Sequence, residues 1–368
     1  MNLYENKLYQ EDVCAVAGLA LPWHQLHGKK IMLSGATGMI GSFLIDVIMK
    51  KNKDEALDCT VYALSRNSER AKARFSEYVN NPKFIVLTYD AAAPIKFNDL
   101  GDVDYVLHLA SNTHPLQYST DPIGTITTNL IGLLNLLQFA AHHHAIRFVF
   151  ASSNEIYGEN RGDTELFKED YCGYIDSNTL RAGYPESKRC GESLCQAFRK
   201  QKGLDVVIPR LTRTYGPTLL KSDTKALSQF IKAGLFEDNI VLKSSGTQYY
   251  SYQYVADSVS GILTVLLCGK SGEAYNVAEE HSDIMLKDLA GIVAEQCGKK
   301  VIFEIPEAVE AAGYSKATKA RLDGSKLAQL GWKPLYNIHS GLERTLRILR
   351  NIWGGIRPNK ESVYYYQQ

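Results

Sequence analysis

The clearest pattern in the chain is an alternation between short apolar segments and longer amphipathic ones, which begins near Lys29. The short segments are rich in Val, Ile, Leu and Phe, which is typical of buried strands, and longer segments with helical spacing lie between them. The predicted strands are Lys30–Ser34, Thr60–Leu64, Phe84–Thr88, Tyr105–Leu109, Arg147–Ala151 and Asp205–Arg210. This alternation predicts an α/β protein whose parallel sheet has helices on both faces.

The helical segments have apolar residues three and four positions apart, the spacing that places them on one face of a helix. The predicted helices are Ile40–Lys50, Asn129–Ala141, Leu286–Gly298 and Ser340–Ile352. After Arg210 the strand–helix rhythm changes to a loop-rich stretch. We therefore expect an N-terminal extension (1–28) with a short helix, a main sheet domain (29–210), a smaller mixed α/β region (211–350) and a tail (351–368). The third segment is expected to be mainly substrate-binding, with part of it returning to the edge of the main sheet.

Composition excludes several classes of partner. The 41 basic and 40 acidic residues give a net charge of +1, so no overall field attracts nucleic acid or an acidic membrane. No apolar run reaches the roughly 18 residues that cross a bilayer, and the polar start, Met1–Gln10, lacks the layout of a signal peptide. Seven scattered cysteines without C-x-x-C spacing predict reduced thiols, no metal site and a cytoplasmic protein.

A glycine-rich turn follows the first predicted strand, with the spacing G-x-x-G-x-x-G at Gly35, Gly38 and Gly41. Glycines allow a tight turn, close approach of a pyrophosphate, and close packing of the next helix, whose N-terminus favours phosphate. The expected contacts of a dinucleotide here are Gly35, Thr37, Gly38, Met39, Ile40 and Gly41. Residues 29–210 are therefore predicted to form a Rossmann-type, doubly wound dinucleotide-binding domain.

The end of the second strand indicates which nicotinamide dinucleotide is used. An acidic residue there would hold a ribose 2′-hydroxyl, but this chain has Ser65 and Arg66. A guanidinium binds phosphate with its charge and its fork of donors. The sequence therefore favours NADP over NAD as the cofactor.

Tyr184 and Lys188 are four residues apart in a helical segment, so their side chains share one face. An ammonium near a phenol favours the phenolate, and we expect it to lower the pKa of Tyr184 so that this residue accepts a proton near neutral pH. A buried strand upstream ends in Ser153 and Glu155, at the edge of a parallel sheet where ligands bind.

These motifs together resemble the extended short-chain dehydrogenase/reductases that act on nucleotide sugars, the epimerase/dehydratase group. The resemblance covers residues 29 to 350 and includes the glycine turn, His108-Leu109-Ala110, the serine before Tyr157-Gly158, and Tyr184 with Lys188. It implies a nucleotide-diphosphate sugar as substrate and a homodimer whose helices after Asn129 and Tyr184 form a four-helix bundle. The further cofactor contacts that it implies are Asp90, Leu109, Ala110, Ser111, Asn129, Tyr184 and Lys188.

The expected substrate contacts depart from the family pattern. Arg213 stands where an asparagine often contacts the sugar nucleotide, and Tyr250 stands where an arginine usually grips the diphosphate in the motif that contains Gln248. We expect Asn154, Arg213, Gln248 and Tyr250 to contact the substrate. Either Arg213 supplies the charge for the phosphate, or the substrate is held differently.

The resemblance also implies the catalytic roles. Tyr184 takes the proton of the sugar 4-hydroxyl while hydride passes from C4 to the nicotinamide, Lys188 holds the nicotinamide ribose, and Ser153 bonds the reacting oxygen. Related 4,6-dehydratases use a glutamate at the position of Glu155 to abstract the C5 proton, so dehydration is the favoured activity. Asn154 weakens this interpretation, because an amide cannot supply a proton to the leaving hydroxyl.

Other activities remain open. The same residues serve a 4-epimerase, in which Glu155 would be structural, or an NADPH-dependent sugar reductase. A uronate decarboxylase is a further alternative, and the loss of the arginine at Tyr250 counts against it. A dinucleotide sensor without activity is disfavoured because Tyr184 and Lys188 are both present.

Overall fold

A single parallel sheet forms the centre of the molecule. The computed structural model describes residues 2–90, 93–95, 100–111, 118, 120–304 and 318–354. In order across the sheet the strands are β11-β7-β5-β4-β1-β2-β3, with β6 also pairing with β7. Their bounds are β1 Lys30–Ser34, β2 Thr60–Ser65, β3 Phe84–Thr88, β4 Tyr105–His108, β5 Arg147–Phe150, β6 Ser152–Ser153, β7 Val206–Leu211 and β11 Ala274–Val277.

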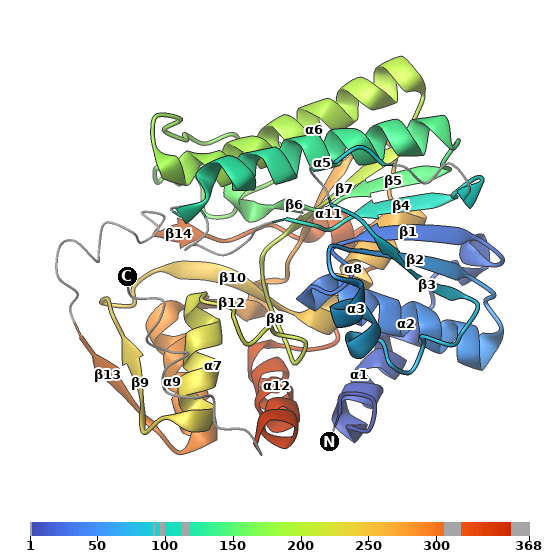
Figure 1. The fold of residues 1–368 in the computed structure, drawn as a ribbon. Coiled ribbons are helices and arrows are strands. Elements are labelled where there is room, and N and C mark those ends of the chain that lie inside the picture. The colour runs from blue at the N-terminus through green and yellow to red at the C-terminus, as the bar shows by residue number, and fades with distance from the viewer. Residues whose placement is uncertain are drawn as a thin grey trace.

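Helices cover both faces of this sheet (Figure 1). Helices α5 (Pro122–His142) and α6 (Gly183–Lys202) pack side by side on one face. On the opposite face lie α2 (Met39–Glu55) and α8 (Val255–Cys268), which contact each other, and α3 (Ser68–Arg74) beside β3. The predicted class, a doubly wound α/β fold, is confirmed.

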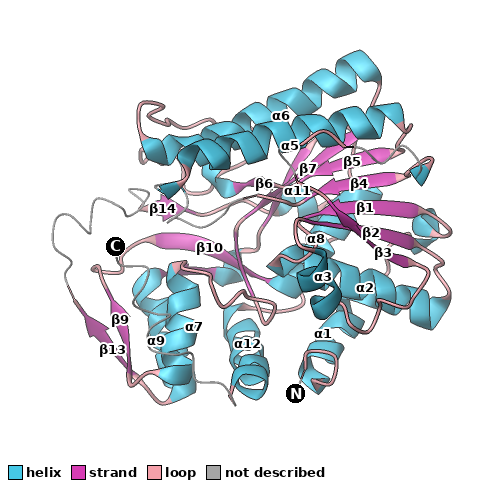
Figure 2. Ribbon diagram, viewed as in Figure 1, coloured by secondary structure: helices cyan, strands magenta, loops and turns pink. Residues whose placement is uncertain are grey.

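A smaller mixed region follows β7 and lies at one end of the main sheet (Figure 2). Strand β10 pairs with β8, β12 and β14, and β9 pairs in parallel with β13. Helices α7, α9 and α12 pack around these strands. The bounds are α7 Ala226–Phe236, α9 Leu286–Cys297, α11 Ser325–Ala328, α12 Ile338–Trp353, β8 Arg213–Tyr215, β9 Asn239–Leu242, β10 Tyr249–Tyr254, β12 Asp283–Met285, β13 Lys300–Phe303 and β14 Lys319–Ala320.

The predicted strands are all present, and each end differs from its prediction by no more than one residue. At one edge of the main sheet β11 pairs with β7, with Ala274 opposite Ile208. The predicted helix at Asn129–Ala141 begins earlier, at Pro122, where Asp121 caps the helix by accepting from the backbone N–H of Gly124.

Helix α5 is long and apolar enough to span a membrane, which the inspection of apolar runs did not predict. Its most apolar stretch is 44% buried inside the structure, and the helix packs on α6 and β4. A core helix of a soluble protein meets the same criterion of length and composition, so α5 is weak evidence for a membrane span.

The N-terminal segment is tied to the body of the protein by a buried carboxylate. The predicted short helix is present as α1 (Lys7–Ala17), which contacts α2, α8 and α12. Asp12 on this helix is 0% exposed; it accepts from the Tyr254 hydroxyl at 2.6 Å and from Arg344 Nε at 2.5 Å. Residues far apart in the sequence therefore share one buried polar network.

We predict that Asp12→Asn destabilises the protein by about 3 kcal/mol, because it leaves a partly buried guanidinium without its buried counter-charge. The free energy of unfolding in urea measures this cost. Glu11→Gln is the matched control, since Glu11 contacts the same Arg344 at 3.0 Å but is largely exposed, so its loss should cost less than about 1 kcal/mol. Equal effects of the two substitutions would contradict the prediction.

Candidate active site

The glycine-rich turn leaves room for a phosphate group at the start of α2. Gly35 has φ +75°, and a Cβ there would lie 2.8 Å from the backbone N of Ala110. Gly38 is the N-cap of α2 and provides no side-chain cap, so the first N–H groups of the helix remain available to an anion. A Cβ on Gly41 would lie 2.3 Å from the Gly35 carbonyl oxygen. This distance is too short for any side chain, so the third position of the motif requires glycine. The turn fits the pyrophosphate of a dinucleotide.

The residues expected near the adenosine half lie at the ends of β2 and β3. Ser65 is 8% exposed, and its hydroxyl bonds to the Asn67 carbonyl at 3.0 Å, so it shapes this turn. Arg66 and Asp90 are exposed. Both are therefore accessible at the carboxyl edge of the sheet, beside the glycine turn.

A chain of hydrogen bonds joins the end of β4 to helices α5 and α6. Ser111 donates to Asn129 at 2.7 Å, Asn129 donates to Ser187 at 2.8 Å, and Ser187 donates to the Tyr184 carbonyl at 2.8 Å. Asn129 is 1% exposed. The predicted asparagine thus connects two helices through its amide and fixes the first turn of α6, which carries Tyr184.

Tyr184 lies beside Ser153, as expected for a proton acceptor and its hydroxyl partner. Burial, followed by the charge of Glu155, raises the pKa of Tyr184 to about 12. Hydrogen bonds to Ser153 and Ser111 and the charge of Arg181 act in the opposite direction. The net shift is opposite to the lowering that the Tyr–Lys spacing predicted, because desolvation of the phenolate outweighs the nearby cations.

Lys188 is 3% exposed and donates to the Ala151 carbonyl oxygen at 2.8 Å. Its Nζ lies 4.8 Å from the ring centroid of Phe150 and 6.0 Å from that of Tyr184. Burial lowers the pKa of Lys188 to about 8. The structure thus brings Ser153, Tyr184 and Lys188 together at the carboxyl edge of the sheet.

Glu155 does not stand alone in this site. Its Oε1 accepts from Arg181 Nη2 at 2.8 Å, and the Arg181 guanidinium lies 4.8 Å from the ring centroid of Tyr118. Tyr118 in turn stacks on Tyr184, with ring centroids 5.0 Å apart at 27°. The sequence analysis missed Arg181 and Tyr118, although the place of Arg181 three residues before Tyr184 was a signal that could have identified it.

Three of the four expected substrate contacts form a second group, with Arg213 on β8, Tyr250 on β10 and Gln248 just before β10. The guanidinium of Arg213 stacks on the ring of Tyr250, 3.5 Å from its centroid. Arg213 Nη1 and Gln248 Oε1 are buried and have no hydrogen-bond partner among the described residues. Ser153 pairs with Leu211, which precedes Arg213 by two residues. The backbone therefore connects the group that contains Ser153 and Tyr184 directly to the group that contains Arg213. Asn154 is 7% exposed, beside Ser153.

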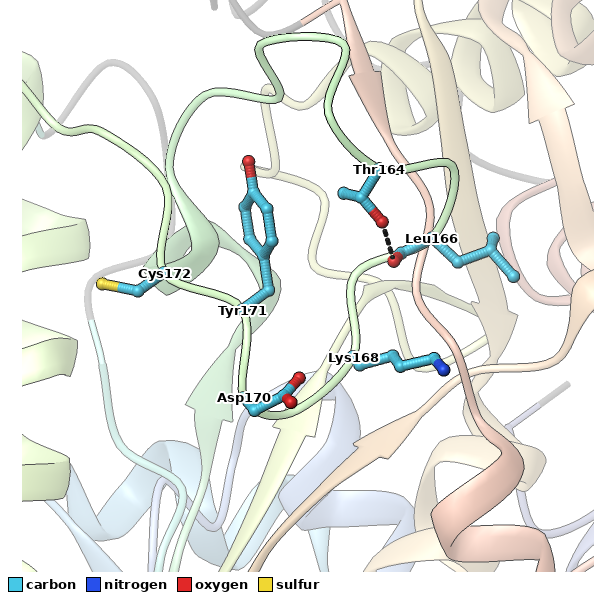
Figure 3. Close-up of a pocket in the computed structure, with 6 residues that line it drawn as sticks. All are labelled: Thr164, Leu166, Lys168, Asp170, Tyr171 and Cys172. Atoms are coloured by element: carbon cyan, nitrogen blue, oxygen red, sulfur yellow. Dashed lines mark hydrogen bonds between the residues drawn. The ribbon is translucent and has the colours of Figure 1, made fainter.

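A separate surface pocket lies on the loop that follows Gly158 (Figure 3). It is lined by Thr164, Leu166, Lys168, Asp170, Tyr171 and Cys172, none of which was a predicted site residue. This pocket is therefore not the candidate active site. The part of the chain that the structure describes also holds no group of three His, Cys, Asp or Glu side chains that could bind a metal ion.

The glycine turn on a doubly wound sheet, together with a tyrosine and a lysine on one helix, is typical of a class of dinucleotide-binding enzymes. The sequence model of the NAD dependent epimerase/dehydratase family matches residues 31–278. The chain belongs to this family, and the resemblance stated from its motifs is confirmed.

Two similar proteins are both named as UDP-glucuronic acid decarboxylases. UDP-glucuronic acid decarboxylase 1 of Xenopus tropicalis is 30% identical over 324 residues, which are 88% of this chain and 72% of that protein. UDP-glucuronic acid decarboxylase 3 of Arabidopsis thaliana is 29% identical over 327 residues, 88% of this chain and 90% of that protein.

Solved structures share the fold. The dTDP-glucose 4,6-dehydratase DesIV of Streptomyces venezuelae, with NAD and TYD bound, has a TM-score of 0.75 and 23% identity, covering 89% of this chain and 98% of that one. The UDP-glucuronic acid 4-epimerase of Bacillus cereus, in complex with UDP-glucuronic acid and NAD, has a TM-score of 0.73 and 23% identity, covering 88% and 99%. At this identity the likeness concerns the fold alone.

We predict that Lys188→Met stabilises the folded protein at pH 7. Burial lowers the pKa of Lys188 from 10.5 to about 8. At a pH where the lysine is protonated in both the folded and the unfolded state, this shift lowers the free energy of unfolding by on the order of 3 kcal/mol. This cost is present below pH 8 and disappears as the pH rises to 10.5. The free energies of unfolding of both proteins at pH 7 and pH 10 measure it, and a gain that does not shrink at pH 10 would contradict the explanation.

Proposed function

We propose that the protein is an NAD-dependent decarboxylase of a nucleotide-linked uronate, of which UDP-glucuronate is the first candidate. The observation that carries this proposal is the 28–30% identity to UDP-glucuronic acid decarboxylases over most of the chain. The sequence analysis favoured 4,6-dehydration and kept uronate decarboxylation as an alternative. The similar proteins support that alternative.

The stacking of Arg213 on Tyr250 answers the main objection to decarboxylation. Tyr250 replaces an arginine that the family uses to grip the substrate, but the guanidinium of Arg213 lies 3.5 Å from the Tyr250 ring centroid. A cation is therefore present beside residue 250 although residue 250 carries no charge. The Nη1 of Arg213 is buried and has no hydrogen-bond partner within the described part of the chain, so it leaves a donor for a phosphate oxygen.

The site residues support a reaction through a 4-ketone. Bound NAD supplies a reversible acceptor for the hydride of sugar C4. Ser153 holds the C4 oxygen. The cationic nicotinamide of bound NAD would favour the phenolate of Tyr184 and offset the effect of burial on its pKa. Tyr184 can then accept the 4-hydroxyl proton, which it returns when the ketone is reduced. With a ketone at C4, a carboxylate on C5 is a β-keto acid. Its C5–C6 bond breaks with release of CO₂, the electron pair is delocalised into the ketone, and C5 takes up one proton from solvent.

A 4,6-dehydratase is the second candidate. The observation that favours it is the presence of Glu155 within the site, in ion-pair contact with Arg181 and close enough to Tyr184 to raise its pKa. In that reaction Glu155 would act as the base at C5. A 4-epimerase or a sugar reductase would use Ser153 and Tyr184 without a role for Glu155.

We propose NAD as the cofactor. The fold neighbours named above are described with NAD, and the expectation of NADP from Arg66 finds no support among them. Arg66 is exposed at the end of β2, where it can stack on an adenine as well as bind a phosphate.

We also propose that the protein works in the cytoplasm. All seven of its cysteines are free, as expected in a reducing compartment. The near-zero net charge gives no reason to expect attachment to an acidic membrane.

We predict that the protein converts UDP-glucuronate to a product that is lighter by the mass of carbon dioxide, with no net consumption of NAD. Mass spectrometry of the nucleotide sugar after incubation measures this. Tyr184→Phe should lower the rate by about 10²–10⁴-fold while the cofactor stays bound, because the ring remains but the proton acceptor is lost. A loss of one water from a neutral nucleotide hexose, without action on UDP-glucuronate, would favour the dehydratase instead.

We propose that the protein is a homodimer in which α5 and α6 pair with those of a second copy. Helix α5 is covered by α6 and the sheet on one side, while Ile123 (76% exposed) and Ile131 (41% exposed) lie on the outward side with Leu130 and Leu134. An exposed apolar helix face of this kind is typical of an interface.

We predict that Ile131→Glu converts the dimer to a monomer at micromolar concentration, because it places a charge in the apolar interface. Sedimentation velocity measures the oligomeric state. Ile146→Glu is the control, since Ile146 is equally exposed (47%) but precedes β5, away from this helix face. A monomeric unaltered protein would contradict the proposal.

A further inference from the structure

Arg181 forms an ion pair with Glu155 that uses only one of its two terminal nitrogens. Arg181 lies in a 3₁₀ turn, Leu180–Ala182, one turn before Tyr184. Its Nη2 donates to Glu155, whereas its Nη1 is buried and has no hydrogen-bond partner among the described residues. Nη1 is hidden from solvent although the side chain as a whole is 38% exposed, so water does not compensate it.

The position of the guanidinium relates it to the reacting end of the sugar. It lies over the ring of Tyr118, and this ring stacks on Tyr184, the expected proton acceptor at the C4 hydroxyl. Only the Tyr118 ring therefore lies between the Arg181 guanidinium and Tyr184, the residue expected to act at C4. A sugar whose C4 hydroxyl faces Tyr184 would bring its neighbouring C5 substituent toward this guanidinium.

The charges of the site distinguish two kinds of C5 substituent. A carboxylate would enter beside Glu155, which carries the same charge and would repel it. Arg181 lies against Glu155 and offsets that repulsion, and an arginine can serve two anions at once because its five N–H donors form a planar fork. A neutral hydroxymethyl group would gain much less from the same guanidinium.

We propose that Arg181 determines specificity for a carboxylate on sugar C5, which Nη1 binds while Nη2 continues to hold Glu155. This inference rests on the proposed function, since it names the group that would recognise a uronate in the same site. A buried charged donor without a partner is costly, and the substrate carboxylate would remove that cost. Arg181 is a specificity-determining residue in this account, and the chemistry at C4 stays with Tyr184.

The test is equilibrium binding of UDP-glucuronate and UDP-glucose by calorimetry, in the full-length protein with Tyr184→Phe to prevent turnover. We expect the Tyr184→Phe protein to bind UDP-glucuronate more tightly than UDP-glucose. Adding Arg181→Gln should weaken UDP-glucuronate about 10- to 100-fold, as for the loss of a charged hydrogen bond, and should leave UDP-glucose within about 2-fold. Unchanged UDP-glucose binding also shows that the variant is folded.

Two further variants separate recognition from mere support of Glu155. Arg161→Gln is the matched control, because Arg161 also stacks on a tyrosine, Tyr174, at 4.7 Å but lies on the surface loop; it should change neither affinity. Glu155→Gln should leave UDP-glucuronate binding as tight or tighter, since it removes a like charge. If Glu155→Gln weakens UDP-glucuronate as much as Arg181→Gln does, Arg181 acts only through Glu155 and the inference fails.

The outcome also separates this inference from the proposed function. Suppose that the unaltered protein decarboxylates UDP-glucuronate and that the Tyr184→Phe variant binds it more tightly than UDP-glucose. If adding Arg181→Gln keeps that binding preference, the inference is overturned while the proposed function stands. If the unaltered protein neither prefers nor converts UDP-glucuronate, the proposed function is overturned and the inference fails with it.

Discussion

Parallel pairing of β1, β4 and β5 is the constraint on which the rest of the structure depends. Because parallel strands end at the same edge, the glycine turn after Ser34, the segment after His108 and the segment after Phe150 meet there. The close approach of Gly35 to Ala110 at this edge leaves no room for a side chain. The glycine turn and the group formed by Ser153, Tyr184 and Lys188 are therefore neighbours as a result of strand direction alone.

Burial sets the chemistry of the residues at this edge. It raises the pKa of Tyr184 and lowers that of Lys188, so each group is held toward its neutral form. Protonated Lys188 is compensated by the Ala151 carbonyl and the Phe150 ring rather than by a carboxylate. A site of this kind is costly to fold and responds strongly to charges that enter with ligands.

The two arginines of the site have a common physical character. Arg181 and Arg213 each stack on a tyrosine, Tyr118 and Tyr250, and each retains a buried Nη1 without a partner among the described residues. Stacking orients a guanidinium without using its donors, which leaves them for an anion. A nucleotide uronate, the substrate class that we propose, carries two such anionic groups, the diphosphate and the carboxylate, and the proposal assigns one arginine to each.

The sequence alone determined the strands of the first domain, the glycine turn and the Tyr184–Lys188 pair, because these depend on residues close together in the chain and on periodic burial. The order of the strands across the sheet came from the tertiary structure. The sequence also placed Ser153 and Asn129 in the site through their motifs. It did not determine the partners of Glu155 and Tyr250, since Arg181 and Arg213 reach them across loops and strand pairing that no local pattern specifies. The direction of the Tyr184 pKa was likewise decided by the tertiary structure, because desolvation depends on everything that packs around the phenol.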